Sequence, residues 1–238
     1  MEISHTFAYL HFGFPRPIVY SLMDSSQFLL DEHCVPKLFD FSNAQCIPEG
    51  ETQIKDALVR GSIGYVALEL FKGETQIKDA LVRGTLGYVA PEHFKGVLDE
   101  KCDVYGFGSL LLKLLTGQRT FDILKADYTT YDCYSKTEDE DLQYSSGTED
   151  EDSGTQDHDL LQNFVKKIKE DNWFIEAVDP IIVGDGLCPE IEQRLKVCKE
   201  LAVKCLSYLG EDRPIMIDAA KQLRQLYLST SYAIHSCS

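Results

Sequence analysis

The sequence predicts a mainly helical α+β fold in which one short β-hairpin precedes a set of amphipathic helices. Two observations support this prediction. Apolar residues recur at spacings of three and four in several stretches, and two short apolar runs near the start are separated by polar residues. With 238 residues, 44% hydrophobic and 26% charged, the chain also has the size and composition of one globular domain.

The first helix and the hairpin are expected within the first 40 residues. Ile3, Phe7 and Leu10 fall at helical spacing, and a glycine and two prolines from position 13 onward stop the pattern. The apolar runs Phe28–Leu30 and Val35–Phe39 are separated by acidic residues and a histidine, so we expect them to pair as the two strands of the hairpin.

Four helices are expected in the second half of the chain. The first spans Val104–Leu114, is apolar on most sides as a central helix would be, and ends at Thr116-Gly117, a C-cap signal. A second helix begins at Leu161, and a third runs from Ile191 to Cys205 with apolar spacings of 4, 3, 4 and 3. Pro214 is expected in the first turn of the last helix.

The charge of the chain is concentrated in one segment. Thr137–Asp159 holds ten Asp and Glu residues and no Lys or Arg, so the rest of the chain accounts for only −6 of the net charge of −16. This acidity disfavours binding to nucleic acid and to anionic membrane surfaces. We expect residues 128–159 to form a solvated, disordered insert; the alternative is an acidic docking tail for a basic partner.

The eight cysteines form no C-x-x-C pair and no cluster with histidine at zinc spacing. We therefore expect reduced, mostly buried thiols and no metal bound through cysteine. No signal peptide opens the chain and no apolar stretch is long enough to cross a bilayer, which predicts a cytoplasmic protein without an integral membrane segment.

A 23-residue unit occurs twice in succession, at Gly50–Lys72 and at Gly73–Lys95. Nineteen of its 23 positions are identical in the two copies. The second copy contains Pro91, whereas the first has Leu68 at that position, and only the second leads directly into the predicted central helix. We therefore expect one copy to be surplus, with residues 50–72 forming a looped-out insert or a poorly ordered strand-helix fragment.

Four motifs in order resemble the C-lobe of a plant receptor-like kinase. They are KLFDFS at Lys37–Ser42, GTLGYVAPE at Gly84–Glu92, DVYGFGSLLLKLLTG at Asp103–Gly117 and EDRP at Glu211–Pro214. The sequences of these motifs are most similar to those of the ZED/ZRK group of receptor-like cytoplasmic pseudokinases. The resemblance implies a protein-kinase-like C-lobe, that is, a truncated kinase fold without an N-lobe.

This resemblance divides the chain into five parts. Residues 1–49 would hold the end of an αE-like helix, the degenerate catalytic loop and the DFG-like segment, and residues 50–95 the duplicated activation segment. Residues 96–127 would form the αF-like region, 128–159 the acidic insert, and 160–238 the C-terminal helices similar to αG to αI of a kinase.

The resemblance also implies that the catalytic loop lacks the residues that a kinase needs for phosphoryl transfer. The family pattern of this loop is H-R-D-x-K-x-x-N. In this sequence Tyr20 and Ser21 occupy the positions of its His and Arg, and Leu22 occupies the position of the aspartate that acts as catalytic base. Asp24 replaces the lysine, and Gln27 replaces the asparagine. A leucine accepts no proton, and an acid at the lysine position would repel a transferred phosphoryl group. We therefore expect no catalytic residue.

Asp40 matches the metal-binding aspartate of the DFG motif and is the only candidate metal ligand. A single carboxylate holds Mg²⁺ weakly without substrate phosphates, so the alternative is an aspartate that caps its own loop. The glycine-rich loop, strand lysine and helix glutamate of a kinase have no counterpart in this sequence. No cofactor is expected.

The remaining family positions are structural. Glu92 and Arg213 match a buried ion pair that anchors the activation segment, with Pro91 beside it, and Asp103 matches the aspartate that holds the catalytic-loop backbone. From Asp40 to Glu92 is 52 residues, and removing one 23-residue copy leaves 29, an ordinary length for that segment. We expect Arg213 to pair with Glu92 rather than with Glu69 of the first copy.

The ZED/ZRK resemblance implies a function in plant innate immunity. It implies an inactive adaptor or decoy that is recognised by an NLR-type immune receptor and targeted by pathogen effectors or sister kinases. The chain would be cytoplasmic, or peripheral at the plasma membrane through its partners. Two alternatives stay open: a degenerate protein Ser/Thr kinase that binds ATP and is complemented by another chain, and a truncated gene product without function.

Overall fold

The computed structural model describes residues 1–21, 23, 25–55, 92, 97–118, 165–184 and 186–235. Within these ranges the chain is rich in helices and has few strands, all of them short. The helices are α1 (Glu2–Phe12), α2 (Glu100–Thr116), α5 (Asp171–Ala177), α6 (Pro180–Val183), α7 (Pro189–Cys205) and α8 (Met216–His235). Single 3₁₀ turns stand at Ser25–Gln27 (η1) and Gly210–Asp212 (η4), and residues 165–169 are also helical.

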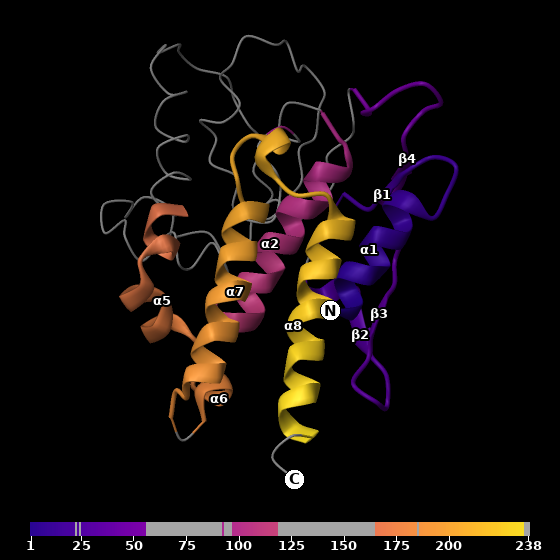
Figure 1. The fold of residues 1–238 in the computed structure, drawn as a ribbon. Coiled ribbons are helices and arrows are strands. Elements are labelled where there is room, and N and C mark those ends of the chain that lie inside the picture. The colour runs from indigo at the N-terminus through magenta and orange to yellow at the C-terminus, as the bar shows by residue number, and fades with distance from the viewer. Residues whose placement is uncertain are drawn as a thin grey trace, which may run out of the picture.

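Four of the helices lie beside one another and form the core. Helix α7 packs along α2, and α8 packs along α1. In Figure 1 the short strands lie on the α1 side of this group, whereas α5 and α6 lie on the α7 side. The buried side chains come from all four helices and include Phe7, Leu112, Leu201 and Met216. No described helix has both the length and the apolarity needed to cross a bilayer.

Helix α2 is buried on most of its circumference, as its apolar sequence predicted. It begins at the N-cap Asp99, whose side chain accepts hydrogen bonds from the backbone of Lys101 (2.9 Å) and Cys102 (3.2 Å). It ends at Gly117, which adopts φ +69°, and the amide of that glycine donates to the carbonyl of Lys113. The predicted C-cap is therefore present, because glycine enters this conformation without steric cost.

The predicted hairpin is present as strands β2 (Phe28–Leu30) and β3 (Pro36–Leu38), which pair antiparallel. Asp31 holds its turn by accepting hydrogen bonds from the backbone of His33 and Val35, both at 2.9 Å. A second two-stranded sheet, β1 (Ile18–Val19) with β4 (Gln45–Cys46), was not predicted. It is too short to leave a periodic signal.

Residues 50–55 are the part of the first repeat copy that the structure describes. Residues 50–72 were expected to form a looped-out insert or a poorly ordered strand-helix fragment, and among the six described ones Ile54 is held by two backbone hydrogen bonds. Its amide donates to the carbonyl of Leu98 (2.8 Å), and the amide of Leu98 donates to the carbonyl of Ile54 (3.0 Å). Ile54 also packs against the core. Residues 56–72, the acidic insert 128–159 and Leu161 lie outside the described residues.

One correction concerns the start of the last helix. Pro214 was expected in its first turn, but α8 begins at Met216, and the first helical hydrogen bonds go to the carbonyl of Ile215. Pro214 therefore lies just before the N-cap, where its fixed backbone angle still limits the approach of the chain to the helix.

Gly108 marks the closest approach of α2 to α7. A methyl group built on Gly108 would lie 2.7 Å from the Cβ of Cys205 and 3.1 Å from the carbonyl oxygen of Ala202. We predict that Gly108→Ala lowers the free energy of unfolding by about 1–3 kcal/mol, because the two helices must move apart. Urea denaturation of both proteins measures this difference.

The control for this prediction is Leu114→Ala, which removes an exposed side chain from the same helix. We expect it to change stability by less than about 1 kcal/mol. Equal stability of Gly108→Ala and the unchanged protein would show that the helices do not pack as closely as described.

The cysteines differ from the prediction of mostly buried thiols. Of the six described cysteines, all are unbridged, three are exposed and only two are buried. The exposed three are Cys34, Cys46 and Cys188. Burial raises the pKa of the Cys205 thiol to about 12, and burial followed by the nearby Glu92 carboxylate raises the pKa of Cys102.

These pKa shifts predict selective alkylation. At pH 8 iodoacetamide should modify Cys34, Cys46 and Cys188 within minutes, because alkylation requires the thiolate, and should leave Cys102 and Cys205 unmodified until urea is added. Mass spectrometry of peptides after timed quenching reports each site. Because the folded pKa of Cys205 lies above its unfolded value near 9, its contribution to stability is complete below pH 9 and is lost as the pH rises toward 12. Rapid alkylation of Cys205 in the folded chain would contradict its burial.

Candidate functional site

Asp103 is the centre of the candidate site. It lies in the first turn of α2 and is almost fully buried. Its Oδ2 accepts hydrogen bonds from the amide of Tyr20 (2.8 Å) and from Nε2 of His11 (2.9 Å), and its Oδ1 accepts from the amide of Ser21 (2.8 Å). One carboxylate thus ties α2 to α1 and to the segment that follows β1.

The segment held by Asp103 is the one predicted to be a degenerate catalytic loop. Leu22 and Asp24, predicted at the base and lysine positions, lie outside the described residues. Tyr20, Ser21 and Gln27 are described. Ser21 is buried and adopts φ +73°, a left-handed conformation that is uncommon for residues other than glycine.

The side chain of Tyr20 fills the space beside this segment. Its hydroxyl donates to the carbonyl of Phe39 (2.8 Å) and lies 3.1 Å from the side-chain oxygen of Gln27. Its ring makes edge contacts with Phe7 (5.7 Å between centroids) and Phe41 (5.6 Å). Burial, followed by the charges of Asp40 and Asp103, raises the pKa of Tyr20, so this phenol stays protonated at neutral pH and works as a packing and hydrogen-bonding group.

Asp40, the predicted metal candidate, is exposed and adopts φ +60°. Its carboxylate accepts a hydrogen bond from the amide of Ser42 (3.1 Å). Hydrogen bonds from the side chain and backbone of Ser42 lower the pKa of Asp40. Asp40 therefore caps its own turn.

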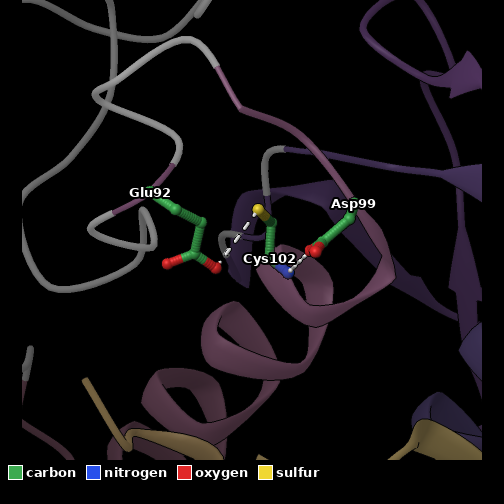
Figure 2. Close-up of side chains that lie close together, drawn as sticks. All are labelled: Glu92, Asp99 and Cys102. Carbon is green, nitrogen blue, oxygen red and sulfur yellow. Dashed lines mark hydrogen bonds between the residues drawn. The ribbon is translucent and has the colours of Figure 1, made fainter. Parts of the chain in front are cut away.

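The helix-start cluster, made of Glu92, Asp99 and Cys102, has the spacing of a metal site. It is the single group of three or more acidic, Cys or His residues with such spacing among the described ranges, and its potential ligand atoms lie within 4.8 Å of one another. Figure 2 shows the thiol of Cys102 directed toward Glu92 and the carboxylate of Asp99 directed toward the Cys102 amide.

Each group of the helix-start cluster already has a structural partner. Both carboxylate oxygens of Glu92 contact Arg213, and Oδ1 of Asp99 caps α2. The thiol of Cys102 donates to Glu92 (3.6 Å), and its raised pKa opposes the thiolate that a metal would need. The cluster therefore serves as the start of a helix, and we assign no metal to it.

Arg213 is the second organising residue, with its side chain fully buried. Its Nη2 donates to Oε2 of Glu92 at 2.9 Å, and its Nη1 donates to Oε1 of the same residue. The guanidinium also lies over the ring of Tyr105, 5.0 Å from its centroid. The remaining bonds go to backbone carbonyls, which are those of Lys101 (3.0 Å), Ser207 (2.8 Å) and Tyr208 (2.9 Å).

The structure thus brings five of the predicted positions into two groups. Asp103 contacts Tyr20 and Ser21, whereas Glu92 contacts Arg213. Pro91 and Glu69 lie outside the described residues. Sequence reasoning missed His11, which bonds Asp103 from α1. Its position four residues after the buried Phe7 places it on the inward face of α1, and that spacing was the available signal.

No protein-family model matches the chain. Its similarity to plant proteins of Arabidopsis thaliana is extensive. It is 25% identical over 225 residues to the non-functional pseudokinase ZRK2 and 29% identical over 229 residues to the inactive serine/threonine-protein kinase ZRK12. Each alignment covers 94% of this chain.

The chain is similar to plant kinase-like proteins. Wall-associated receptor kinase 5 of the same plant is 27% identical over 231 residues, or 97% of this chain. The chain spans less than half of these relatives, namely 48% of ZRK2, 43% of ZRK12 and 24% of the wall-associated kinase. Proteins named as kinases and proteins named as inactive both occur among them.

Proposed function

We propose that the chain is a catalytically inactive, kinase-like interaction module of the ZED/ZRK type. In this proposal its fold corresponds to the C-lobe of a protein kinase. It acts in the plant cytoplasm as an adaptor or decoy in immune signalling, bound by an NLR-type receptor. The single observation that best supports inactivity is the set of contacts made by Tyr20, whose hydroxyl bonds Phe39 and Gln27 and whose ring packs on Phe7 and Phe41 within the candidate catalytic region.

The two groups around Asp103 and Arg213 support a scaffold. Asp103 fixes the backbone at Tyr20 and Ser21, and Arg213 fixes Glu92 to the start of α2. Each group holds a buried charge with several hydrogen bonds, and removing one partner from such a group is strongly destabilising. Neither group presents a base, a nucleophile or a free carboxylate to solvent.

The region where chemistry would occur supports the same conclusion. The Tyr20 hydroxyl donates to the carbonyl of Phe39 and contacts the side-chain oxygen of Gln27, so these polar groups already have hydrogen-bond partners within the chain. Asp40 accepts its bond from Ser42, faces solvent, and belongs to no group of three or more potential metal ligands among the described residues. Neither feature suits the joint binding of Mg²⁺ and nucleotide phosphates.

One surface suits a protein partner. Leu29 lies on the face of the hairpin opposite Phe28, because side chains alternate along a strand, and Phe39 directly follows β3. We call these two residues the outer hairpin face. Phe28 and Leu38 pack on the core, whereas Leu29 is 58% exposed and Phe39 is 40% exposed. Exposed large apolar side chains favour burial against another protein.

The names of the relatives also support an alternative. Wall-associated receptor kinase 5 is named as a kinase, so a kinase that binds nucleotide with help from further protein is the second candidate. A gene product without function is the third. Thermal unfolding of the purified chain with and without millimolar Mg-ATP separates the first two, because a ligand that binds the folded state raises Tm. We expect no rise, and a rise of several degrees would favour the kinase.

Recovery of partners from plant tissue tests the adaptor function. A tagged chain should co-purify an NLR-type receptor, and Leu29→Asp with Phe39→Asp should abolish recovery. Ile181→Asp, on α6, is the matched control because it adds a charge at an exposed apolar position away from the outer hairpin face. The proposal would be contradicted if the unchanged chain recovered no receptor. It would also be contradicted if the unchanged chain, the double variant and Ile181→Asp all recovered the same amount.

A further inference from the structure

A cavity of about 490 Å³ lies between α7 and the helical residues 165–169, away from the candidate site. We call it the lysine cavity, because four of the eight residues that line it are lysines. These are Lys169, Lys196, Lys199 and Lys204, together with Val165, Glu200, Val203 and Ser207.

The sequence of α7 explains why so many lysines meet there. Lys199 lies three residues and Lys204 eight residues after Lys196 on α7, and at 3.6 residues per turn both intervals return to within about a quarter turn of Lys196. Lys169 reaches the cavity from the facing helical stretch, where Val165, one turn earlier, adds an apolar wall. The cavity thus combines aliphatic walls with positive charge.

The charge of the lysine cavity is opposite to that of the chain. Its lining holds four ammonium groups and one carboxylate, that of Glu200, whereas the chain carries a net charge of −16. Lys199 is 5% exposed, and its Nζ lies 3.4 Å from the carbonyl of Lys169 and 5.5 Å from the ring centroid of Phe174. The exposed lysines around it make a concave positive surface, which attracts carboxylates.

We propose that the lysine cavity binds a carboxylate-rich peptide, and that its occupant is the chain's own segment Thr137–Asp159. This segment holds ten carboxylates and no lysine or arginine, and it ends six residues before Val165. Six residues reach up to about 20 Å, enough to bring its end to the cavity. A tethered ligand also binds at an effective concentration on the order of millimolar.

This inference is independent of the proposed function. Binding of the acidic segment would mask a positive surface on an acidic protein, so that other acidic ligands could not occupy it. The inference holds or fails whether or not the chain binds an immune receptor.

The test uses a fluorescent peptide with the sequence of residues 137–159 and two full-length chains. One chain is unchanged, and in the other residues 137–159 are replaced by a Gly/Ser linker of equal length. Fluorescence anisotropy at low ionic strength measures the Kd. We expect the linker chain to bind the peptide at least tenfold more tightly than the unchanged chain, whose own segment competes.

Charge reversal locates the site. In the linker chain, Lys169→Glu, Lys196→Glu and Lys204→Glu together should weaken peptide binding at least tenfold. The control reverses three exposed lysines elsewhere, with the same change in net charge: Lys37→Glu, Lys55→Glu and Lys221→Glu. Circular dichroism checks that both variants fold, and all six substitutions are at exposed positions.

Two results would overturn the proposal. Equal loss of binding in the two charge-reversed variants would mean that net charge, and not the lysine cavity, attracts the peptide. Equal Kd values for the unchanged chain and the linker chain would mean that the segment does not occupy the cavity, and an acidic region of another protein would then be the occupant. A peptide with Asn and Gln in place of Asp and Glu should not bind.

Discussion

Replacing Arg213 with alanine is expected to lower the free energy of unfolding by about 3–5 kcal/mol. The substitution leaves the Glu92 carboxylate without its partner and removes donors from three backbone carbonyls around it. It also removes the cation above the Tyr105 ring. Since a typical domain has only about 5–15 kcal/mol of stability, most of the chain could unfold at 37 °C. Urea denaturation followed by circular dichroism measures the change.

Arg224→Ala is the matched control for this prediction. Arg224 lies on the exposed side of α8, so its loss should change the stability by no more than about 0.5 kcal/mol. If Arg213→Ala were as stable as Arg224→Ala, the ion pair with Glu92 would not anchor the start of α2, and the scaffold that supports the proposed function would lose one of its two organising residues.

Replacing Asp103 with asparagine is expected to cost about 3 kcal/mol or more. The neutral amide keeps one acceptor oxygen, whereas Asp103 accepts from Tyr20 and Ser21 on different oxygens and also from His11. The amide nitrogen of asparagine would therefore face a donor inside the core. Hydrogen exchange locates the effect, because the amides of Tyr20 and Ser21 should exchange faster than those of α8.

Asp218→Asn is the control for Asp103. Asp218 is exposed and its contact with Lys221 is a surface ion pair, so its loss should leave both stability and exchange nearly unchanged. Unchanged exchange at Tyr20 and Ser21 in Asp103→Asn would mean that the segment after β1 is held by packing of the Tyr20 ring and not by the carboxylate.

The long elements could be predicted because each repeats one local rule many times. Helices α2 and α7 carry apolar stripes over several turns, and Gly117 ends α2 as its sequence indicates. The hairpin was also predictable, because two apolar runs flank the turn that begins at Asp31. In these segments local preference and tertiary packing agree.

The contacts that shape the candidate site could not be predicted in this way. The bond from His11 to Asp103 joins residues 92 positions apart, and no local rule specifies it. Tyr20 was expected only as a departure from a motif, whereas its hydroxyl and ring tie it to Phe39 and Phe41. The contact of Glu92 with Arg213 was expected from the family resemblance alone, and Leu22 and Asp24 remain predictions.

The bridge between Ile54 and Leu98 bears on how the fold accommodates the duplicated segment. Ile54 belongs to the first copy, whereas Glu92, which holds Arg213, belongs to the second. These two contacts lie on either side of the duplicated segment. The entropy cost of closing a loop rises only slowly with its length when the ends are held. We therefore expect both contacts to form whether the chain carries one 23-residue copy or two.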